Sequence, residues 1–186
     1  MSMRVLIASL LAALTVTATN VSAGEFVAFD SGTRPQSVRL IGYLARPQGA
    51  GPFSAVILLH GCGGFHSSMI SWADRLSRSG YAALAIDSFG PRGMEDNCGG
   101  FFFHEQAADG YAALGYLATK PFVRASHVAL MGFSRGGGSV LAALEKGLLE
   151  QRYVEKFRAG MAFYPVCQYA SGIMTGPVLV LSLIHI

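Results

Sequence analysis

The chain of 186 residues is 52% hydrophobic and only 13% charged, a balance that excludes intrinsic disorder over most of its length. That length corresponds to one domain. The net charge is +3 with scattered basic residues, which argues against a nucleic-acid-binding face, because such faces need clustered basic side chains.

The N-terminus has the pattern of an export signal. Arg4 precedes an apolar stretch from Val5 to about Ala18, and Val21-Ser22-Ala23 provides the small-residue end that a signal peptidase reads. The apolar core has about 14 residues, fewer than the ~20 of a membrane-spanning helix, so a membrane anchor is the weaker interpretation. We expect residues 1–23 to be a signal peptide cleaved after Ala23. The mature protein would then be secreted or periplasmic, with no stable membrane span.

Apolar runs and helix-period segments alternate along the rest of the chain. Two strands are expected first, at 25–29 and 38–45. Later apolar runs predict strands of a buried, parallel sheet at 55–59, 81–86, 128–131, 160–164 and 178–181. Helices are expected at 67–79, 104–119 and 135–146, with a shorter one continuing through Phe157.

This alternation predicts parallel βαβ units in one α/β domain over residues 24–181. We expect a mostly parallel sheet with helices on both faces. The chain shows no internal repeat, linker or second domain.

The strongest chemical signal is the run from Gly132 to Gly136, which reads G-F-S-R-G. It follows a predicted strand and opens a predicted helix, the context that a nucleophile elbow requires. The glycines leave room for a sharp turn that exposes the Ser134 hydroxyl. The backbone N–H of Arg135 then lies at a helix N-terminus, where an anion is favoured. The alternative is a glycine-rich turn that merely begins a helix.

A second glycine-rich turn, from His60 to Gly64, directly follows the buried strand 55–59. A serine hydrolase needs a second backbone N–H to stabilise the oxyanion, and a loop at this place supplies it. We expect the N–H of Cys62 to be that donor. An ordinary strand-to-helix turn is the alternative.

Export changes how the cysteines are interpreted. Cys62, Cys98 and Cys167 lack the spacing of a zinc site, and an oxidising compartment favours disulfides. Cys62 and Cys98 both lie in loops at the carboxyl ends of predicted strands, so we expect a disulfide between them. Cys167 would then pair with a cysteine outside this sequence.

Together, these runs make the chain resemble the dienelactone hydrolase family of α/β-hydrolases, in its exported branch. The resemblance covers about residues 36–181 and rests on four runs: L-L-H-G-C-G-G-F at 58–65, S-G-Y-A-A-L-A-I-D-S-F-G-P-R-G at 79–93, M-G-F-S-R-G-G at 131–137 and A-F-Y-P at 162–165. It implies an α/β-hydrolase fold and cleavage of small esters or lactones by a Cys or Ser nucleophile with an Asp and a His. The nucleophile position here is Ser134.

The C-terminal end departs from this family. In an α/β-hydrolase the acid and the histidine follow the serine along the chain. After Ser134 there is no Asp, the glutamates lie on predicted helices, where exposure to solvent is expected, and the one later histidine is His185. The tail 182–186 is similar to translated sequencing-adapter read-through. We therefore expect a C-terminally truncated fragment that lacks its triad Asp and His and ends in a non-native tail.

Other polar and aromatic residues are expected to have structural roles. His60 and Asp87 are interpreted as structural rather than catalytic. Arg92 is expected to be solvated, with contact to a substrate carboxylate as the alternative. Trp72 and the run Phe101–Phe103 are expected to pack in the fold or to form a pocket wall.

Two hypotheses for function follow. In the first, the full-length protein is a serine hydrolase of small esters or lactones that needs no metal or organic cofactor, and Ser134 attacks the carbonyl. In the second, it is a non-catalytic binding protein on the same fold. The chain beyond residue 181 distinguishes the two, because it would contain the acid and the base.

Overall fold

A computed structural model describes residues 24–31, 37–100, 102–167 and 172–182. The predicted signal peptide lies outside these residues, as do His185 and all of the predicted tail except Ser182.

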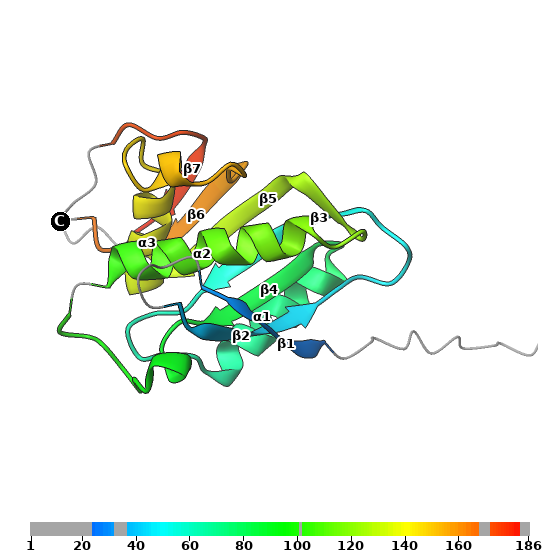
Figure 1. The fold of residues 1–186 in the computed structure, drawn as a ribbon, viewed down its shortest axis with the longest axis horizontal. Coiled ribbons are helices and arrows are strands. Elements are labelled where there is room, and N and C mark those ends of the chain that lie inside the picture. The colour runs from blue at the N-terminus through cyan, green and yellow to red at the C-terminus, as the bar shows by residue number, and fades with distance from the viewer. Residues whose placement is uncertain (1–23, 32–36, 101, 168–171, 183–186) are drawn as a thin grey trace, which may run out of the picture.

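Seven strands of the described chain form one sheet in the order β1-β2-β4-β3-β5-β6-β7 (Figure 1). Their bounds are β1 Glu25–Asp30, β2 Arg39–Ala45, β3 Phe53–Leu59, β4 Ala82–Asp87, β5 Val123–Phe133, β6 Ala159–Phe163 and β7 Val178–Leu181. The pairs β1–β2 and β2–β4 are antiparallel, whereas all pairs from β4 through β3, β5 and β6 to β7 are parallel. The predicted α/β class with a mostly parallel sheet is confirmed.

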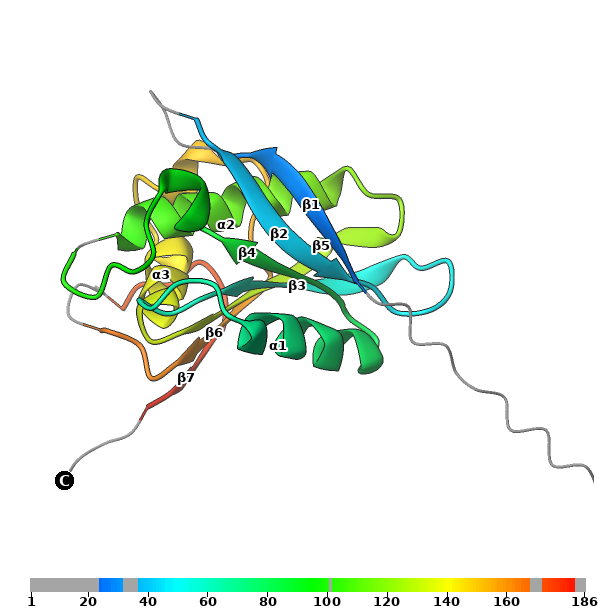
Figure 2. The same cartoon turned by 90° about the horizontal axis from the view of Figure 1, so that it is seen from below.

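Helices cover both faces of this sheet, as expected (Figure 2). The α-helices are α1 Ser67–Arg78, α2 Phe103–Ala118 and α3 Arg135–Leu144, and two short 3-10 turns are η1 Gly90–Arg92 and η2 Glu150–Arg152. Helix α1 lies on one face, and α2 and α3 lie together on the other. Among the described residues, no helix has the length and apolarity needed to cross a bilayer.

The central strand β3 explains why both faces must be covered. Its side chains alternate, so that Ile57 and Leu59 pack in the core beneath α2 and α3, while Val56 and Leu58 pack in the core beneath α1. All four are buried. A continuous apolar run is therefore the sequence pattern of a strand that faces a core on each side.

Two expected elements differ from the structure. Strand β5 begins at Val123 rather than at residue 128, and a register shift between Phe53 and Ala55 on the neighbouring strand interrupts its pairing. The polar residues before Val128 concealed this early part of the strand. The helix expected through Phe157 is wrong, because only the 3-10 turn η2 forms there.

The reason for the missing helix lies in Glu145, which follows α3. Its backbone is extended, and it forms an antiparallel bridge with Met174, so the chain pairs with a later segment after α3. In η2, Glu150 is 7% exposed, and its Oε2 lies 2.7 Å from Lys156 Nζ. The expectation that this glutamate would be exposed to solvent is therefore wrong.

Candidate active site

The predicted nucleophile, Ser134, lies in the turn between β5 and α3 with φ 53° and ψ −113°. A positive φ is uncommon for a residue with a side chain, and such strain is concentrated at functional sites. The two flanking glycines permit the turn. A Cβ on Gly132 would lie 2.2 Å from the carbonyl oxygen of Gly136, and a Cβ on Gly136 would lie 2.4 Å from that of Leu59. The predicted strand–turn–helix context of the elbow is confirmed.

The backbone of Ser134 is fixed, but its hydroxyl is not. Its N–H donates to the carbonyl of Phe163 at 2.9 Å, and its carbonyl accepts from the N–H of Gly138 at 3.0 Å. The half-buried side chain lines a pocket. Among the described residues, no hydrogen bond engages its hydroxyl, so the group is free to meet a ligand.

The glycine-rich turn after β3 lies beside this serine. A Cβ on Gly61 would be 3.6 Å from the Cβ of Ser134, which is ordinary contact distance. The two predicted oxyanion donors are the N–H groups of Cys62 and Arg135, and no acceptor in the described chain takes either of them. Arg135 begins α3, and an unpaired N–H at a helix N-terminus favours a negatively charged oxygen. The role of both N–H groups as oxyanion donors stays a prediction.

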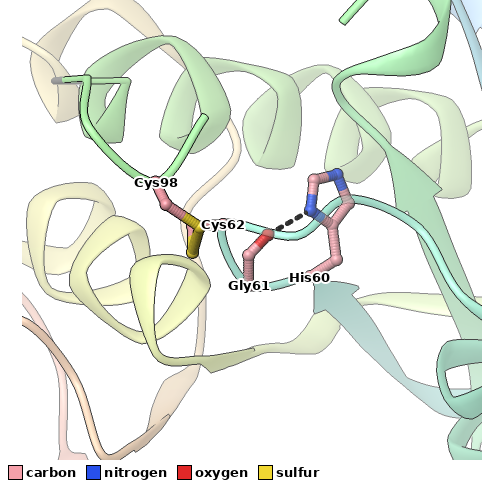
Figure 3. The surroundings of a disulfide bond; sticks show 4 residues. All are labelled: His60, Gly61, Cys62 and Cys98. Atoms are coloured by element: carbon pink, nitrogen blue, oxygen red, sulfur yellow. Dashed lines mark hydrogen bonds between the residues drawn. A yellow bond between two sulfur atoms is a disulfide. The ribbon is translucent and has the colours of Figure 1, made fainter. Parts of the chain in front are cut away.

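The same turn is fixed from the other side by a disulfide between Cys62 and Cys98, with Cα atoms 4.7 Å apart (Figure 3). A hydrogen bond at 2.9 Å from the N–H of Asn97 to the carbonyl of Cys62 lies next to it. The predicted pairing of these two cysteines is confirmed. Cys167 is a free, exposed thiol in this structure, and its proposed partner outside the sequence stays a prediction.

His60 is completely buried, and both nitrogens of its ring have partners. Because the N–H of Ser88 donates to Nε2 at 3.1 Å, the ring proton resides on Nδ1, which donates to the carbonyl of Gly61 at 2.7 Å (Figure 3). Burial lowers its pKa and so keeps the ring neutral. The carbonyl of His60 accepts from Gln106 Nε2 at 3.0 Å. These contacts agree with the structural role expected for His60.

Asp87 also has the expected structural role. Its Oδ1 accepts the N–H groups of Phe89 and Gly90, each at 2.9 Å, and so begins the turn after β4. By contrast, the expectation that Arg92 would be solvated is wrong. Its guanidinium is bound to the buried carboxylate of Asp109 and to the carbonyl of Ser88, so it is neither solvated nor available to a substrate.

The side chain of Arg135 is buried. The residue is only 4% exposed, and its guanidinium carbon lies 5.1 Å from the centre of the Phe103 ring. In the described chain, Nε and Nη1 have no hydrogen-bond partner, and burial lowers the pKa of the group. Phe102 contacts Arg92 in a similar way. Both phenylalanines thus pack on arginines, and neither lines the pocket beside Ser134.

The pocket beside Ser134 has a volume of about 430 Å³. Glycines of the turn after β3 and several aromatic side chains contribute to its lining. Its lining residues are His60, Gly61, Gly63, Gly64, His66, Ser68, Met69, Trp72, Phe133, Ser134, Phe163 and Tyr164. Trp72 therefore forms part of the pocket wall, as expected. His66, the residue before α1, also lies here.

Sequence reasoning missed the aromatic lining residues Phe133, Phe163 and Tyr164. They lie at the carboxyl ends of β5 and β6, and ligands of open α/β sheets bind at this edge. That rule would have identified them. Within the described residues, no group of three or more potential ligand side chains could hold a metal ion.

Comparisons with known proteins identify a family for this chain. A family model described as "Dienelactone hydrolase family" matches residues 40–177. A Synechocystis sp. protein named "Putative carboxymethylenebutenolidase" is 28% identical over 119 residues, covering 55% of this chain and 47% of that protein. The chain thus spans about half the length of this curated relative.

Solved structures show the same fold. The crystal structure named "Putative Dienelactone Hydrolase" from Klebsiella pneumoniae subsp. pneumoniae has a TM-score of 0.62 at 20% identity, covering 84% of this chain and 72% of that one. Thermogutta terrifontis esterase 2, phosphoramylated by tabun, has a TM-score of 0.60 at 18% identity, with 78% and 58% covered. The sheet and its helices are therefore an α/β-hydrolase fold.

Proposed function

The chain belongs to the dienelactone hydrolase family, and on that premise we propose that the whole protein cleaves small esters or lactones with Ser134 as its nucleophile. One observation carries this proposal: Ser134 has a strained, positive φ between two glycines that no larger residue could replace, and its hydroxyl faces a pocket. A serine that only began a helix would need none of this strain.

The reaction is a two-step acyl transfer. Ser134 Oγ attacks the carbonyl carbon and gives up its proton to a base, and the N–H groups of Cys62 and Arg135 stabilise the resulting oxyanion. Collapse of this intermediate breaks the bond to the leaving alcohol, which takes the proton, and leaves the acyl group on Ser134. Water then gives a proton to the same base and attacks the acyl carbonyl. The ester bond to Ser134 Oγ breaks, Oγ takes that proton back, and the acid is released.

The base and its orienting acid belong, in this proposal, to chain outside the described residues. Three observations support it: the free hydroxyl of Ser134, the absence of Asp after it, and the family order of serine, acid and histidine. His60 is excluded as the base because Ser88 and Gly61 engage both of its ring nitrogens. We therefore propose that residues 24–182 alone are an inactive part of the enzyme.

Export is part of the same proposal. The Cys62–Cys98 disulfide supports a periplasmic or secreted location, because such bonds persist in oxidising compartments. The N-terminal pattern of residues 1–23 is the second support.

A non-catalytic binding protein is the second candidate, and the free hydroxyl of Ser134 is the observation in its favour. Treating the product of the complete gene with a fluorophosphonate probe distinguishes the hydrolase from the binding protein. We expect covalent labelling at Ser134, located by mass spectrometry, and hydrolysis of p-nitrophenyl acetate.

A matched control is available in the same pocket. Ser68 is an exposed serine that lines the pocket from α1. Ser134→Ala is expected to abolish labelling and turnover, and Ser68→Ala to retain both. If Ser134→Ala hydrolysed the ester at the parent rate, a binding role for this serine would be the better account.

A further inference from the structure

A buried carboxamide joins the two turns of the candidate site. Gln106 lies on α2 and is 0% exposed. Its Nε2 donates to the carbonyl of His60 at 3.0 Å, and its Oε1 accepts from Ser139 Oγ at 2.8 Å. His60 begins the glycine-rich turn that contains Cys62 (Figure 3). Ser139 lies on α3, the helix that follows Ser134. One side chain therefore connects the turn after β3 to the helix of the nucleophile turn.

The chemistry of the two partners fixes the orientation of this carboxamide. A carbonyl oxygen can only accept a hydrogen bond, so the NH₂ group of Gln106 must face His60. The hydroxyl of Ser139 then donates to the amide oxygen. Ser139 Oγ is also 3.3 Å from the carbonyl oxygen of Arg135, but the contact with Gln106 is shorter and takes the hydroxyl proton. The hydrogen bonds thus run in one direction, from Ser139 through Gln106 to His60.

The strand pairing of β3 with β5 stops before these turns. Its register ends with Leu59 opposite Gly132. After that point backbone packs on backbone: a Cβ on Gly136 would lie 2.4 Å from the carbonyl oxygen of Leu59 and 2.6 Å from that of His60. Such packing has no side chain to interlock, whereas the two hydrogen bonds of Gln106 are directional. They define where the turn at His60 lies relative to α3.

The burial of Gln106 indicates that these bonds matter. Taking a carboxamide out of water is unfavourable unless hydrogen bonds replace those to water, and an apolar side chain would pack between the helices without that cost. The docking of α2 on α3 also has a separate bond, because Tyr111 Oη donates to the carbonyl of Ala143 at 2.7 Å. What Gln106 adds to the packing of the two helices is its bond to the turn at His60.

We propose that Gln106 is a positioning residue of the hydrolase. It holds the turn after β3 against α3, and so sets the places of the N–H groups of Cys62 and Arg135 relative to Ser134 Oγ. The inference rests on the proposed function, in which those N–H groups stabilise the oxyanion. Gln106 does not line the pocket beside Ser134, so it acts through the backbone of the turn.

The test uses the product of the complete gene. Gln106→Met keeps the length of the side chain but cannot donate, so the carbonyl of His60 loses this partner, while the hydroxyl of Ser139 can turn to the carbonyl of Arg135. We expect kcat for p-nitrophenyl acetate to fall by about tenfold to a hundredfold, since a small displacement of preorganised donors is costly. KM should stay within about twofold, because the oxyanion is stabilised in the transition state and not in the bound substrate.

Tyr111→Phe is the matched control. It also removes a buried hydrogen bond between α2 and α3, and it leaves the carbonyl of Ala143 without that donor. We expect Tyr111→Phe and Gln106→Met to lower the urea midpoint of unfolding to a similar extent, but Tyr111→Phe to keep kcat within about twofold. A merely structural contribution of Gln106 would reduce stability without separating kcat from KM.

Ser139→Ala tests the other end of the bridge. It leaves the amide oxygen of Gln106 without its donor, so kcat should fall by about twofold to tenfold at unchanged KM. Because the two residues act through one bridge, the double variant should lose no more kcat than Gln106→Met alone. Ser139→Ala also carries the test if Gln106→Met does not fold.

The outcomes separate this inference from the proposed function. An unchanged kcat in folded Gln106→Met or in Ser139→Ala overturns the inference, while labelling of Ser134 in the parent protein still supports the hydrolase. An equal loss of kcat in Tyr111→Phe also overturns it, because the loss would then come from looser packing of α2 on α3. Losses that multiply in the double variant overturn the bridge. A parent protein that neither labels nor hydrolyses the ester overturns the proposed function, and the inference with it.

Discussion

Arg92, in the loop after β4, and Asp109, on α2, form a bidentate ion pair. Nη1 of Arg92 lies 2.8 Å from Oδ2 of Asp109, and Nη2 lies 2.9 Å from Oδ1. The Asp109 side chain is 0% exposed and that of Arg92 is 14% exposed. Burial raises the pKa of Asp109, and the guanidinium opposes that rise. The pair joins α2 to the loop that also contains Cys98.

Breaking this pair should be costly. In Arg92→Met the carboxylate of Asp109 stays buried without its partner, so we expect the free energy of unfolding to fall by about 3–5 kcal/mol in urea denaturation. The exposed pair of Arg39 and Asp30, with side chains 66% and 72% exposed, is the control. Arg39→Met should cost less than about 1 kcal/mol. Equal losses in the two variants would contradict a special role for the buried pair.

The disulfide between Cys62 and Cys98 gives a second prediction. It closes a loop with a sequence separation of 36 residues, so Cys62→Ala/Cys98→Ala should lower the free energy of unfolding by about 2–4 kcal/mol. Cys167 is free and exposed, and Cys167→Ala should change the free energy of unfolding by no more than about 0.5 kcal/mol. Thermal melting with and without reductant checks both, since the double variant should no longer respond to reductant.

The glycines of the elbow give a third prediction. Gly132→Ala places a methyl group 2.2 Å from a backbone oxygen, so it should destabilise the fold or displace Ser134. Gly115→Ala is the matched control. Gly115 lies in α2, and a Cβ added there would have no neighbouring atom within 4 Å. That change should stabilise the protein by about 0.5–1 kcal/mol, since glycine disfavours helix. Denaturant titration measures the free energy of unfolding of both variants. If Gly132→Ala were as stable as the parent protein and kept Ser134 in place, the tight turn would be refuted.

The buried ring of His60 predicts a pH dependence of stability. Its pKa is lowered in the folded state, so below about pH 6.5 the unfolded chain binds more protons. The stability that His60 contributes is present above about pH 6.5 and is lost as the pH falls through the folded pKa. His60→Asn should reduce this acid-side loss. Denaturation curves of the parent protein and of His60→Asn at pH 5, 6 and 7 measure this loss of stability. Asp109 is present in both proteins, so its contribution cancels in the comparison.

The last prediction concerns turnover. Residues 24–186 should not hydrolyse p-nitrophenyl acetate above the rate of their own Ser134→Ala variant, because a hydroxyl without an adjacent base is a weak nucleophile. Spectrophotometric release of p-nitrophenol measures both. Turnover that depends on Ser134 in this chain would place the base among its own histidines, and His66 would be the first candidate because it lines the pocket.

Most of the fold could be predicted because strong local patterns specify it. The apolar run of β3, the helix period of α1 with Gly80 at its end, and the glycines around Ser134 each have one good structural solution. The helix expected through Phe157 was wrong because Glu145 pairs with Met174, a contact between distant segments that local pattern does not contain. Arg92 was misplaced for the same reason, since its partner lies on another element.

The site was predictable where a motif specifies backbone geometry. The turn at Ser134 follows from glycines at fixed positions, and the cysteine pairing follows from two loops at one sheet edge. The catalytic roles of Ser134, Cys62 and Arg135 stay predictions. The aromatic lining residues were missed because Phe133 and Phe163 look like core residues in sequence. Only the order of strands shows that their rings meet beside Ser134.

Three glycines follow Arg135, the first residue of helix α3. Each would contact a different part of the chain if it had a side chain: Gly136 the end of β3, Gly137 the end of β6, and Gly138 the start of α2. Three glycines cost a helix roughly 3 kcal/mol relative to alanine, so this turn of helix is weak by itself. On the ribosome, α3 emerges before β6, whose Phe163 carbonyl binds the N–H of Ser134. The turn that exposes Ser134 therefore assembles only after β6 has been synthesised and has docked, which makes it a late step in the maturation of the protein.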